Sequence, residues 1–256
     1  MVSREIAIDP VFANVLAGRG TDREDTAKPT GAASMQAAET RFLELGYHAT
    51  RVSEVARDAH VSIGSIYVHY ESKEGLYGAV VARALDIEER YVDAALLSEE
   101  LNDLEKLITL GEAYVQFFRD FPGHFRLLMM PSEPIPEEAT GSEVARRVAA
   151  RGDRQRKLLA EVIARCIDQG LVQEGIDAPR AANFWWATWN GVIGLSLRSD
   201  DLAIDEDEME RVMIAGRMML AEGFASAAVR DGDGRLLPEF RERLERLDPP
   251  SVSSPG

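Results

Sequence analysis

The chain has 256 residues, 45% of them hydrophobic, and a formal net charge of −15. This length suffices for two modest hydrophobic cores, so we expect two domains. The single cysteine, Cys166, excludes an intrachain disulfide and fits a reducing compartment. Cys166 lies in an apolar run of the sequence. A buried, small hydrophobic side chain is therefore a simpler interpretation of Cys166 than a redox sensor. The start of the chain does not resemble a secretion signal, and the most apolar stretch, Phe184 to Leu197, is too short to cross a bilayer. We expect a soluble, cytoplasmic protein with no membrane partner.

Residues 34–81 hold the most informative pattern, which begins with an amphipathic helix. Gly46 follows the last apolar position of that helix, where a left-handed residue favours glycine, and we expect the helix to end there. Thr50 is then expected to cap a short second helix with its hydroxyl. The apolar positions that define the first helix are Met35, Ala38, Phe42 and Leu45.

A third helix follows the second after a tight turn. Ser62 is expected to cap it, and apolar or aromatic residues then recur three and four apart. Two short helices about a turn of roughly three residues form a helix-turn-helix, whose second member enters the DNA major groove. The recurring positions are Ile63, Ile66, Tyr67 and Tyr70.

Residues 34–81 contain three characteristic segments: Gly46-Tyr47-x-x-Thr50, Val61-Ser62-x-Gly64-Ser65-Ile66-Tyr67-x-His69-Tyr70 and Ser72-Lys73-Glu74-x-Leu76. With these segments, the region resembles the TetR family of one-component bacterial regulators. The resemblance implies an all-helical chain with a DNA-binding head and a larger ligand-binding and dimerisation domain. By position, the residues implied to contact DNA are Thr50, Arg51, Ser62, Ile63, Gly64, Ser65, Tyr67, His69, Tyr70 and Lys73.

Two positions differ from the common family pattern. His60 stands where relatives often have glycine in the turn, and a left-handed histidine costs on the order of 1 kcal/mol, so we expect the turn to survive. Ile63 stands where relatives often carry Lys or Arg, and it offers only apolar contact, for instance to a thymine methyl. The operator sequence therefore does not follow from the resemblance.

The distribution of charge weakens the objection that an acidic chain would not bind DNA. Residues 34–83 carry a net charge of −1, whereas residues 84–225 carry −12. The head is thus nearly neutral and the rest of the chain holds the acidity. We expect modest non-specific affinity and strong salt dependence.

The remainder of the chain reads as helices separated by Pro- and Gly-containing breaks, and no strand-like alternation is sustained, so the predicted fold class is all-α. Expected helices span about 72–97, 102–121, 143–169, 179–197 and 205–225, with short pieces at 124–130 and 236–247. The predicted domains are a disordered N-terminal extension (1–33), the helix-turn-helix domain (34–81), the ligand-binding and dimerisation domain (82–227) and a C-terminal tail (228–256). Basic residues in the extension are a candidate minor-groove arm.

All three tryptophans lie in the segment Phe184 to Gly191. This segment resembles a TetR subgroup with a Trp-His-Gly signature, although Asn190 stands in place of the histidine. The alternative is that the tryptophans only pack in the hydrophobic core and at the dimer interface. The helix is apolar nearly all round, and it must therefore be covered on more than one side.

The resemblance implies a homodimer in which the last two long helices of each subunit form a four-helix bundle, so that two heads read a palindrome. A stripe with small residues on the last helix fits close helix approach. The residues expected at the dimer interface are Val192, Met209, Val212, Met213, Gly216, Leu220 and Gly223.

The remaining apolar residues suggest an effector cavity, with a filled core as the alternative. The aromatic and Met-rich lining favours a hydrophobic or aromatic small molecule, and Arg126 or His124 would suit a carboxylate if either faces inward. The expected lining residues are Tyr114, Phe117, Phe118, Phe125, Leu128, Met129, Trp186 and Asn190.

An enzyme is disfavoured, because the sequence contains no paired cysteines, phosphate-binding glycine loop or nucleophile motif. We expect no catalytic residues, metal or cofactor. The favoured function is a repressor that a small-molecule effector releases from operator DNA, repression being the usual mode of the family. A TetR-like protein-interaction module that has lost operator binding is the alternative, motivated by the neutral head and Ile63.

Overall fold

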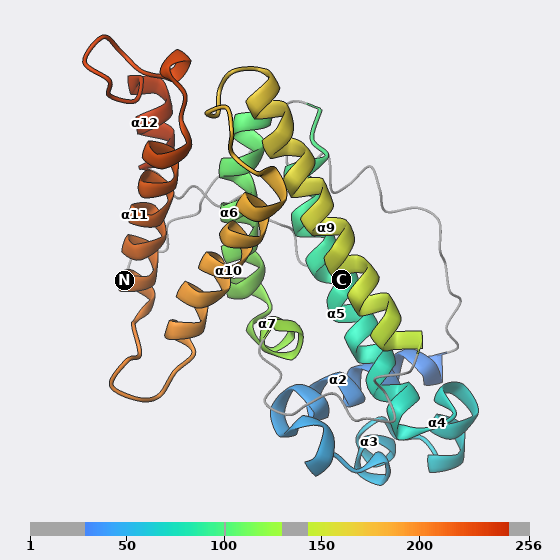
Figure 1. Ribbon diagram of the computed structural model, residues 1–256. Helices are drawn as coiled ribbons and strands as arrows, with labels where there is room; N and C mark the ends of the chain where they lie inside the picture. Colours follow the sequence, from blue (N-terminus) through green and yellow to red (C-terminus); the bar gives the residue numbers. More distant parts are fainter. Residues whose placement is uncertain (1–28, 100, 130–142, 246–256) are drawn as a thin grey trace. The chain divides into compact units, whose positions relative to one another are not determined.

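The computed structural model of the protein describes residues 29–99, 101–129 and 143–245. Within these ranges the chain is helical, with one 3-10 turn and two isolated β-bridges, and the predicted all-α fold is confirmed (Figure 1). The elements are α2 (Pro29–Ala49), α3 (Val52–Asp58), α4 (Ile63–Tyr70), α5 (Lys73–Leu96), α6 (Asp103–Asp120), α7 (Pro122–Met129), α9 (Glu143–Asp168), α10 (Ala178–Ser196), α11 (Glu206–Phe224), η1 (Ala227–Val229) and α12 (Pro238–Leu244).

The chain forms two compact units, which are described separately. The head unit comprises Gly18–Glu89 and Phe118–Gly152, and the body unit contains Arg90–Phe117 and Asp153–Gly256. Helices α5, α6 and α9 each contribute one stretch to each unit. The sequence placed the head at residues 34–81; the compact head unit also includes α7, which packs against α2. The expected disordered extension lies mostly outside the described residues, but Pro29–Ala33 already belong to α2.

The first helix of the head differs in detail from expectation. Gly46 has a positive φ of 78° and non-helical backbone angles, so the first helical stretch ends there as expected; a short helical turn follows across a kink and completes α2. Thr50 is only 1% exposed and donates its hydroxyl to the carbonyl oxygens of Gly46 (2.8 Å) and Arg41 (3.1 Å). It therefore secures the end of α2 and does not cap α3, whose N-cap position is Arg51.

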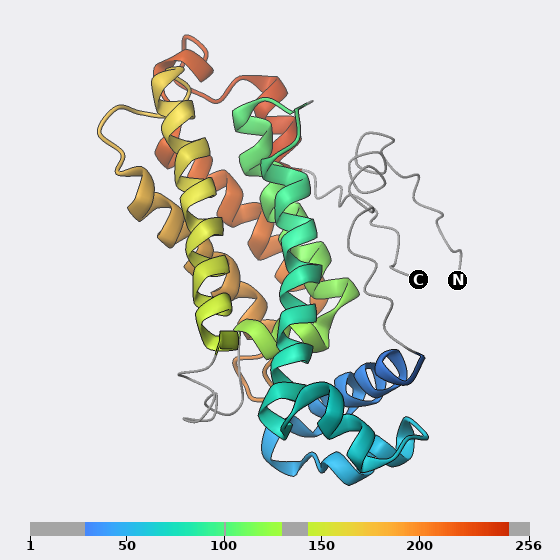
Figure 2. The same ribbon diagram turned by 90° about the vertical axis from the view of Figure 1, so that its right-hand side faces the viewer.

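The head is held by an aromatic and aliphatic core. The short helices that surround this core are seen in Figure 2. The rings of Phe42, Tyr47 and Tyr77 pack together, with centroid distances of 5.1 Å from Tyr77 to each of the other two. Gly75 is required where α5 begins, because a Cβ there would lie 2.0 Å from the carbonyl oxygen of Tyr70. This close approach fixes the turn between α4 and α5.

The body unit is a set of long helices in which α10 packs against α11 (Figures 1 and 2). Helix α6 approaches α10 closely, since a Cβ on Gly111 would lie 2.7 Å from the indole ring of Trp189. Arg154 of α9 forms a bidentate ion pair with Asp93 of α5, at 3.0 and 3.3 Å. Asp177 and Asp205 cap α10 and α11 through the backbone N–H groups of Arg180 and Glu208.

Residues 226–245 are folded, although the sequence suggested a tail from residue 228; the short helix expected at about 236–247 is present as α12. Ser226 caps η1, an antiparallel bridge pairs Arg230 with Leu236, and α12 follows. Val229, Leu236 and Leu244 are 4%, 5% and 6% exposed, because they belong to a core cluster of the body unit. A chain segment with three buried anchors of this kind is ordered by hydrophobic burial.

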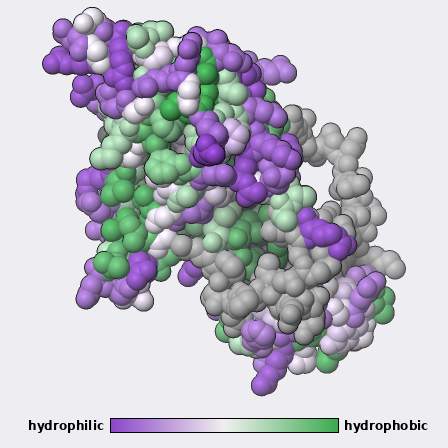
Figure 3. Space-filling view, in the orientation of Figure 1, coloured by the Kyte–Doolittle hydropathy of each residue, from purple (hydrophilic) through white to green (hydrophobic). Residues whose placement is uncertain are grey.

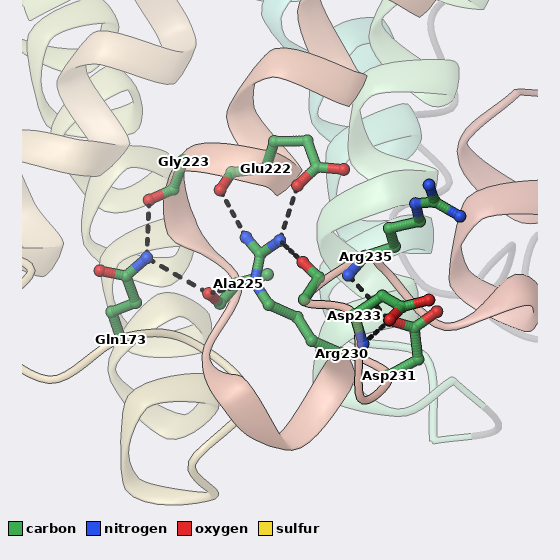
Figure 4. Close-up of polar contacts among 9 residues, drawn as sticks. Gln173, Glu222, Gly223, Ala225, Arg230, Asp231, Asp233 and Arg235 are labelled. Carbon is green, nitrogen blue, oxygen red and sulfur yellow. Dashed lines mark hydrogen bonds and ion pairs between the residues drawn. The ribbon is translucent and has the colours of Figure 1, made fainter.

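Arg230 ties this segment to the end of α11 (Figure 4). Its guanidinium donates to the Glu222 carboxylate at 2.7 Å and to the carbonyl oxygens of Glu222 and Gly234. Gln173 donates to the carbonyl oxygens of Gly223 and Ala225 from the other side. The C-terminal segment is thus anchored by polar contacts as well as by its apolar residues.

None of the helices in the described ranges is long and apolar enough to span a membrane. Across the same residues, no cluster of three or more His, Cys, Asp or Glu side chains has a geometry suited to a metal ion.

Candidate nucleic-acid interface

The turn between α3 and α4 adopts the conformation that a helix-turn-helix requires. His60 has a φ of 55°, and the N–H of Val61 donates to the carbonyl oxygen of Ala56 at 2.9 Å. The predicted turn survives with histidine in place of glycine. Ser62 caps α4, as predicted, because its Oγ accepts from the N–H of Ser65 at 3.0 Å.

Helix α4 is anchored by one face and exposed on the other. Ile66 is fully buried, whereas Ile63 and Tyr67 are 44% and 45% exposed and Val68 is 81% exposed. Large hydrophobic side chains at such exposure leave an apolar surface uncovered by the head. Val68 was not predicted; its signal is an apolar residue on the face opposite Ile66.

Gly64 lies on this exposed face beside Ser62. A Cβ built on Gly64 would meet nothing nearer than the Ser62 Oγ at 3.8 Å. The protein's own packing therefore does not require glycine here. A missing side chain at the start of an exposed helix lets another surface approach the backbone and the helix N-terminus closely, which suits a phosphate or base edge.

Lys73 occupies a defined position at the start of α5. Its Nζ lies 4.5 Å from the centroid of the Tyr47 ring and 3.4 Å from the carbonyl oxygen of His48. Tyr47 donates its hydroxyl to Glu74 at 2.5 Å, and this hydrogen bond is the main cause that holds the pKa of Glu74 below its usual value. These contacts keep the ammonium near the end of α2.

Two of the predicted DNA contacts have structural roles in the head. The Thr50 hydroxyl is used within α2, as described above, and Tyr70 is half-buried with its hydroxyl donated to the carbonyl oxygen of Gly31 at 3.2 Å. Burial raises the pKa of the Tyr70 phenol. The exposed members of the predicted set are Arg51, Ser62, Ile63, Gly64, Tyr67 and His69.

Other cations of the head are engaged in ion pairs. Arg41 of α2 contacts Asp58 and Glu54 at 2.6 and 3.3 Å and so joins α2 to α3, and the hydrogen bond from Arg41 lowers the pKa of Asp58. Arg57 also contacts Asp58, at 3.3 Å. In the described part of the head, Arg41 and Arg57 are therefore less available to a phosphate backbone, and this lowers the expected non-specific affinity.

The residues expected to line an effector cavity fall into both units. In the body, Tyr114 donates its hydroxyl to Asn190 Oδ1 at 2.9 Å, and its ring lies 5.1 Å from Trp186. Phe117, also in the body, is fully buried against Tyr91. The remaining four residues belong to the head unit, where Leu128 packs on the head core; they are Phe118, Phe125, Leu128 and Met129.

The residues expected at a dimer interface divide between the interior and the surface of the protomer. Met209, Met213 and Leu220 are 0%, 1% and 9% exposed and belong to the core of the body. The sequence analysis placed these three residues and the small residues on one stripe of the last helix. Helical spacing shows which residues share a face, but it does not show which of them are buried within the protomer. Partly or fully exposed are Val192, Val212, Gly216 and Gly223.

Large apolar residues are also exposed on α10 and α11, and we call these residues, together with Gly191 and Gly216, the α10–α11 face. Phe184 on α10 is 57% exposed and Met219 on α11 is 74% exposed. A Cβ on Gly191 or Gly216 would meet no other atom within 4 Å. Figure 3 shows hydrophobic side chains along α11.

Comparison with protein families agrees with this geometry. Residues 35–80 match the model described as "Bacterial regulatory proteins, tetR family". Residues 107–232 match the model described as "Tetracyclin repressor-like, C-terminal domain". The two matches cover the helix-turn-helix and most of the body.

Curated relatives and solved structures lead to the same family. The chain is 30% identical over 150 residues to the transcriptional activator FasR of Mycolicibacterium smegmatis, covering 56% of this chain and 68% of FasR. It is 25% identical over 151 residues to the repressor KstR2 of Mycobacterium tuberculosis, covering 59% of this chain and 72% of KstR2. The solved KstR2 structure superposes with a TM-score of 0.55 at 21% identity, over 76% of this chain and 94% of KstR2.

A solved complex of FadR from Bacillus subtilis with stearoyl-CoA superposes with a TM-score of 0.54 at 19% identity, over 67% of this chain and 90% of FadR. At this identity the structural likeness establishes the fold alone. The family matches, the FasR alignment and the capped, outward-facing α4 together show that the chain belongs to the TetR family of DNA-binding transcriptional regulators.

Proposed function

We propose that the protein is a homodimeric repressor that binds operator DNA through α4 and leaves it when a hydrophobic effector binds the body. The observation that carries the proposal is the face of α4, where Ile63, Tyr67 and Val68 are exposed around a glycine that the head's packing does not need. A helix presented in this way fits the major groove.

The α10–α11 face supports the dimer. Large apolar side chains and bare glycines lie together there, and a second copy of the same surface would cover both. Two heads are needed because one head reads only half of a palindromic site, and the half-sites lie about 34–36 Å apart. The interface residues proposed are Phe184, Gly191, Gly216 and Met219.

The effector is proposed to contact Tyr114, Trp186 and Asn190. Asn190 already accepts from Tyr114 and donates to the carbonyl oxygen of Trp186 at 2.9 Å, so the site offers an aromatic surface with an oriented amide. Acyl-CoA thioesters are the first class to test, since FadR of Bacillus subtilis binds stearoyl-CoA. An effector shifts operator affinity only through unequal affinity for the two states of the dimer, and a tenfold loss needs about 1.4 kcal/mol.

The test is fluorescence anisotropy with labelled DNA from upstream of the chain's own gene, at several salt concentrations and with the dimer mass checked by light scattering. Tyr67→Ala is expected to weaken binding at least about tenfold, because its exposed phenol lies on the DNA-facing side of α4. Lys73→Ala should lower the log-log salt slope by about one unit.

Leu45→Ala is the matched control, because Leu45 has the same 45% exposure as Tyr67 but lies on α2. Equal binding by the wild type, Tyr67→Ala and Leu45→Ala, with no change in slope for Lys73→Ala, would contradict DNA recognition by α4. A wild type that shows no salt-dependent DNA binding at all would favour the protein-interaction module.

A further inference from the structure

A cavity lies beneath the C-terminal segment of the body unit, apart from the Tyr114, Trp186 and Asn190 set. Its volume is about 60 Å³, well above the roughly 10–15 Å³ that one water needs by this measure. Walls come from α6, α10, α11, the turn after α9 and the segment that ends in α12. The lining residues that matter here are Leu107, Ile108, Leu220, Ala221, Phe240 and Leu244.

The chemistry of the lining is almost wholly hydrocarbon. The charged residue on the wall, Arg217, is engaged by the Glu112 carboxylate, which accepts from Arg217 at 3.1 Å and from both terminal nitrogens of Arg243 at 2.6 and 2.8 Å. The carboxylate thus already has three charged donors. A charged group entering the cavity would lose most of its hydration, because most of the lining is hydrocarbon.

The C-terminal segment forms one side of the cavity. Val229, Leu236, Phe240 and Leu244 face it from that segment, and Arg243 on α12 ties the segment to Glu112 on α6. Arg230 ties its beginning to Glu222 (Figure 4). The cavity is therefore covered by a short segment held at two points rather than by a long packed helix.

We propose that this cavity is a binding site for an uncharged hydrocarbon group, either a short alkyl chain or a single aromatic ring. Empty apolar cavities lower stability because their walls lose dispersion contacts, and a hydrocarbon restores those contacts without needing a hydrogen bond. The site is independent of operator recognition by α4. A carboxylate on the ligand is expected to weaken binding, because it would lose its hydration against walls that are mostly hydrocarbon.

The experiment measures thermal denaturation and calorimetric binding of the full chain with benzene and n-hexane, and with benzoate and hexanoate as their charged counterparts. At least one of the two hydrocarbons should raise the Tm in a concentration-dependent way, and its carboxylate counterpart should bind at least tenfold more weakly. The comparison of benzene with n-hexane decides between a ring and a chain. Failure of both hydrocarbons to bind would overturn the proposal.

Two variants test the location. Ala221→Leu places three additional carbons in the cavity and should weaken hydrocarbon binding at least tenfold, whereas Ala150→Leu adds the same side chain to an exposed position of α9 and should leave binding unchanged. Phe240→Ala enlarges the cavity and should shift the preference toward naphthalene, at least threefold relative to benzene. Wild-type binding in Ala221→Leu, or an unchanged size preference in Phe240→Ala, would place the hydrocarbon elsewhere and contradict the site.

Discussion

The head and the body use arginine–carboxylate pairs in opposite environments. In the head, Arg41 bridges Glu54 and Asp58, with side chains between 22% and 35% exposed. In the body, Arg217 and Glu112 pair with side chains that are each 1% exposed. The charges and the N–O distances of these pairs are similar, but the pairs differ in their exposure to solvent.

Exposure to solvent decides how much each pair contributes to the free energy of unfolding. Water and salt screen the head pairs, so each contributes roughly 0–1 kcal/mol. The body pair is costly to bury, and the loss of one partner leaves a desolvated charge, which costs about 3–5 kcal/mol. Burial lowers the pKa of Arg217, and the Glu112 carboxylate opposes this shift.

The largest effect on stability is expected for the buried ion pairs that Glu112 forms with Arg217 and Arg243. Glu112→Ala should lower the free energy of unfolding by about 3–5 kcal/mol, because the carboxylate that both Arg217 and Arg243 contact is removed. Urea denaturation followed by circular dichroism measures this loss. Glu161→Ala, at an exposed position of α9, is the control and should change stability by less than about 0.5 kcal/mol. A loss of under about 1 kcal/mol for Glu112→Ala would mean that burial does not separate the two regions.

A smaller effect is expected in the head. Arg41→Met should cost about 1 kcal/mol or less, and the cost should shrink between 0.05 and about 0.5 M salt as screening grows. Arg57→Met is the matched control, since Arg57 contacts the same Asp58 but its side chain is 69% exposed. A salt-independent loss of several kcal/mol for Arg41→Met would show that the head pairs behave like the buried ones.

The smallest effect on stability is expected at acidic pH, where Glu39 becomes protonated. The hydrogen bond with His124, at 2.5 Å, together with Arg83 at 3.1 Å, holds the pKa of Glu39 below its usual 4.5. A carboxylate with a lowered folded-state pKa contributes stability above the unfolded pKa and loses it as the pH falls through the folded value. Comparing the wild type with Glu39→Gln from pH 6 to 3, we expect their stabilities to converge only below about pH 4.5. A constant difference across that range would rule out Glu39 titration as the source.

Local sequence patterns predicted the helices well, because the spacing of apolar residues and the capping residues mark where a helix lies. Ser62, Asp205 and the left-handed Gly46 behave as their residue types suggest. The short helix near 236–247 was expected, but the packing of the C-terminal segment onto the body was missed, because its three buried anchors, Val229, Leu236 and Leu244, are separated by charged residues and show no periodicity. Their burial depends on long-range packing onto the body, which no local pattern reveals.

Site residues were predicted less evenly for the same reason. Motif position identified the exposed side of α4, but Thr50 and Tyr70 share that motif while serving the head's own structure. On α11 the apolar stripe is real, yet Met209 and Met213 are covered within the protomer. The ion pairs of Glu112 join residues that lie far apart in the sequence, and helical spacing carries no information about such pairs.

The clustering of the tryptophans gives the protein a built-in optical probe. Trp185 lines the C-terminal cavity, the ring of Trp186 lies at a tilt against that of Tyr114, and Trp189 lies beside Gly111, all on α10. Because all 3 tryptophans of the chain lie on this helix, tryptophan emission reports on one helix of the body. A change in that emission when unlabelled operator DNA is added would therefore be a direct spectroscopic readout of communication from α4 to α10, with no dye and no engineered residue.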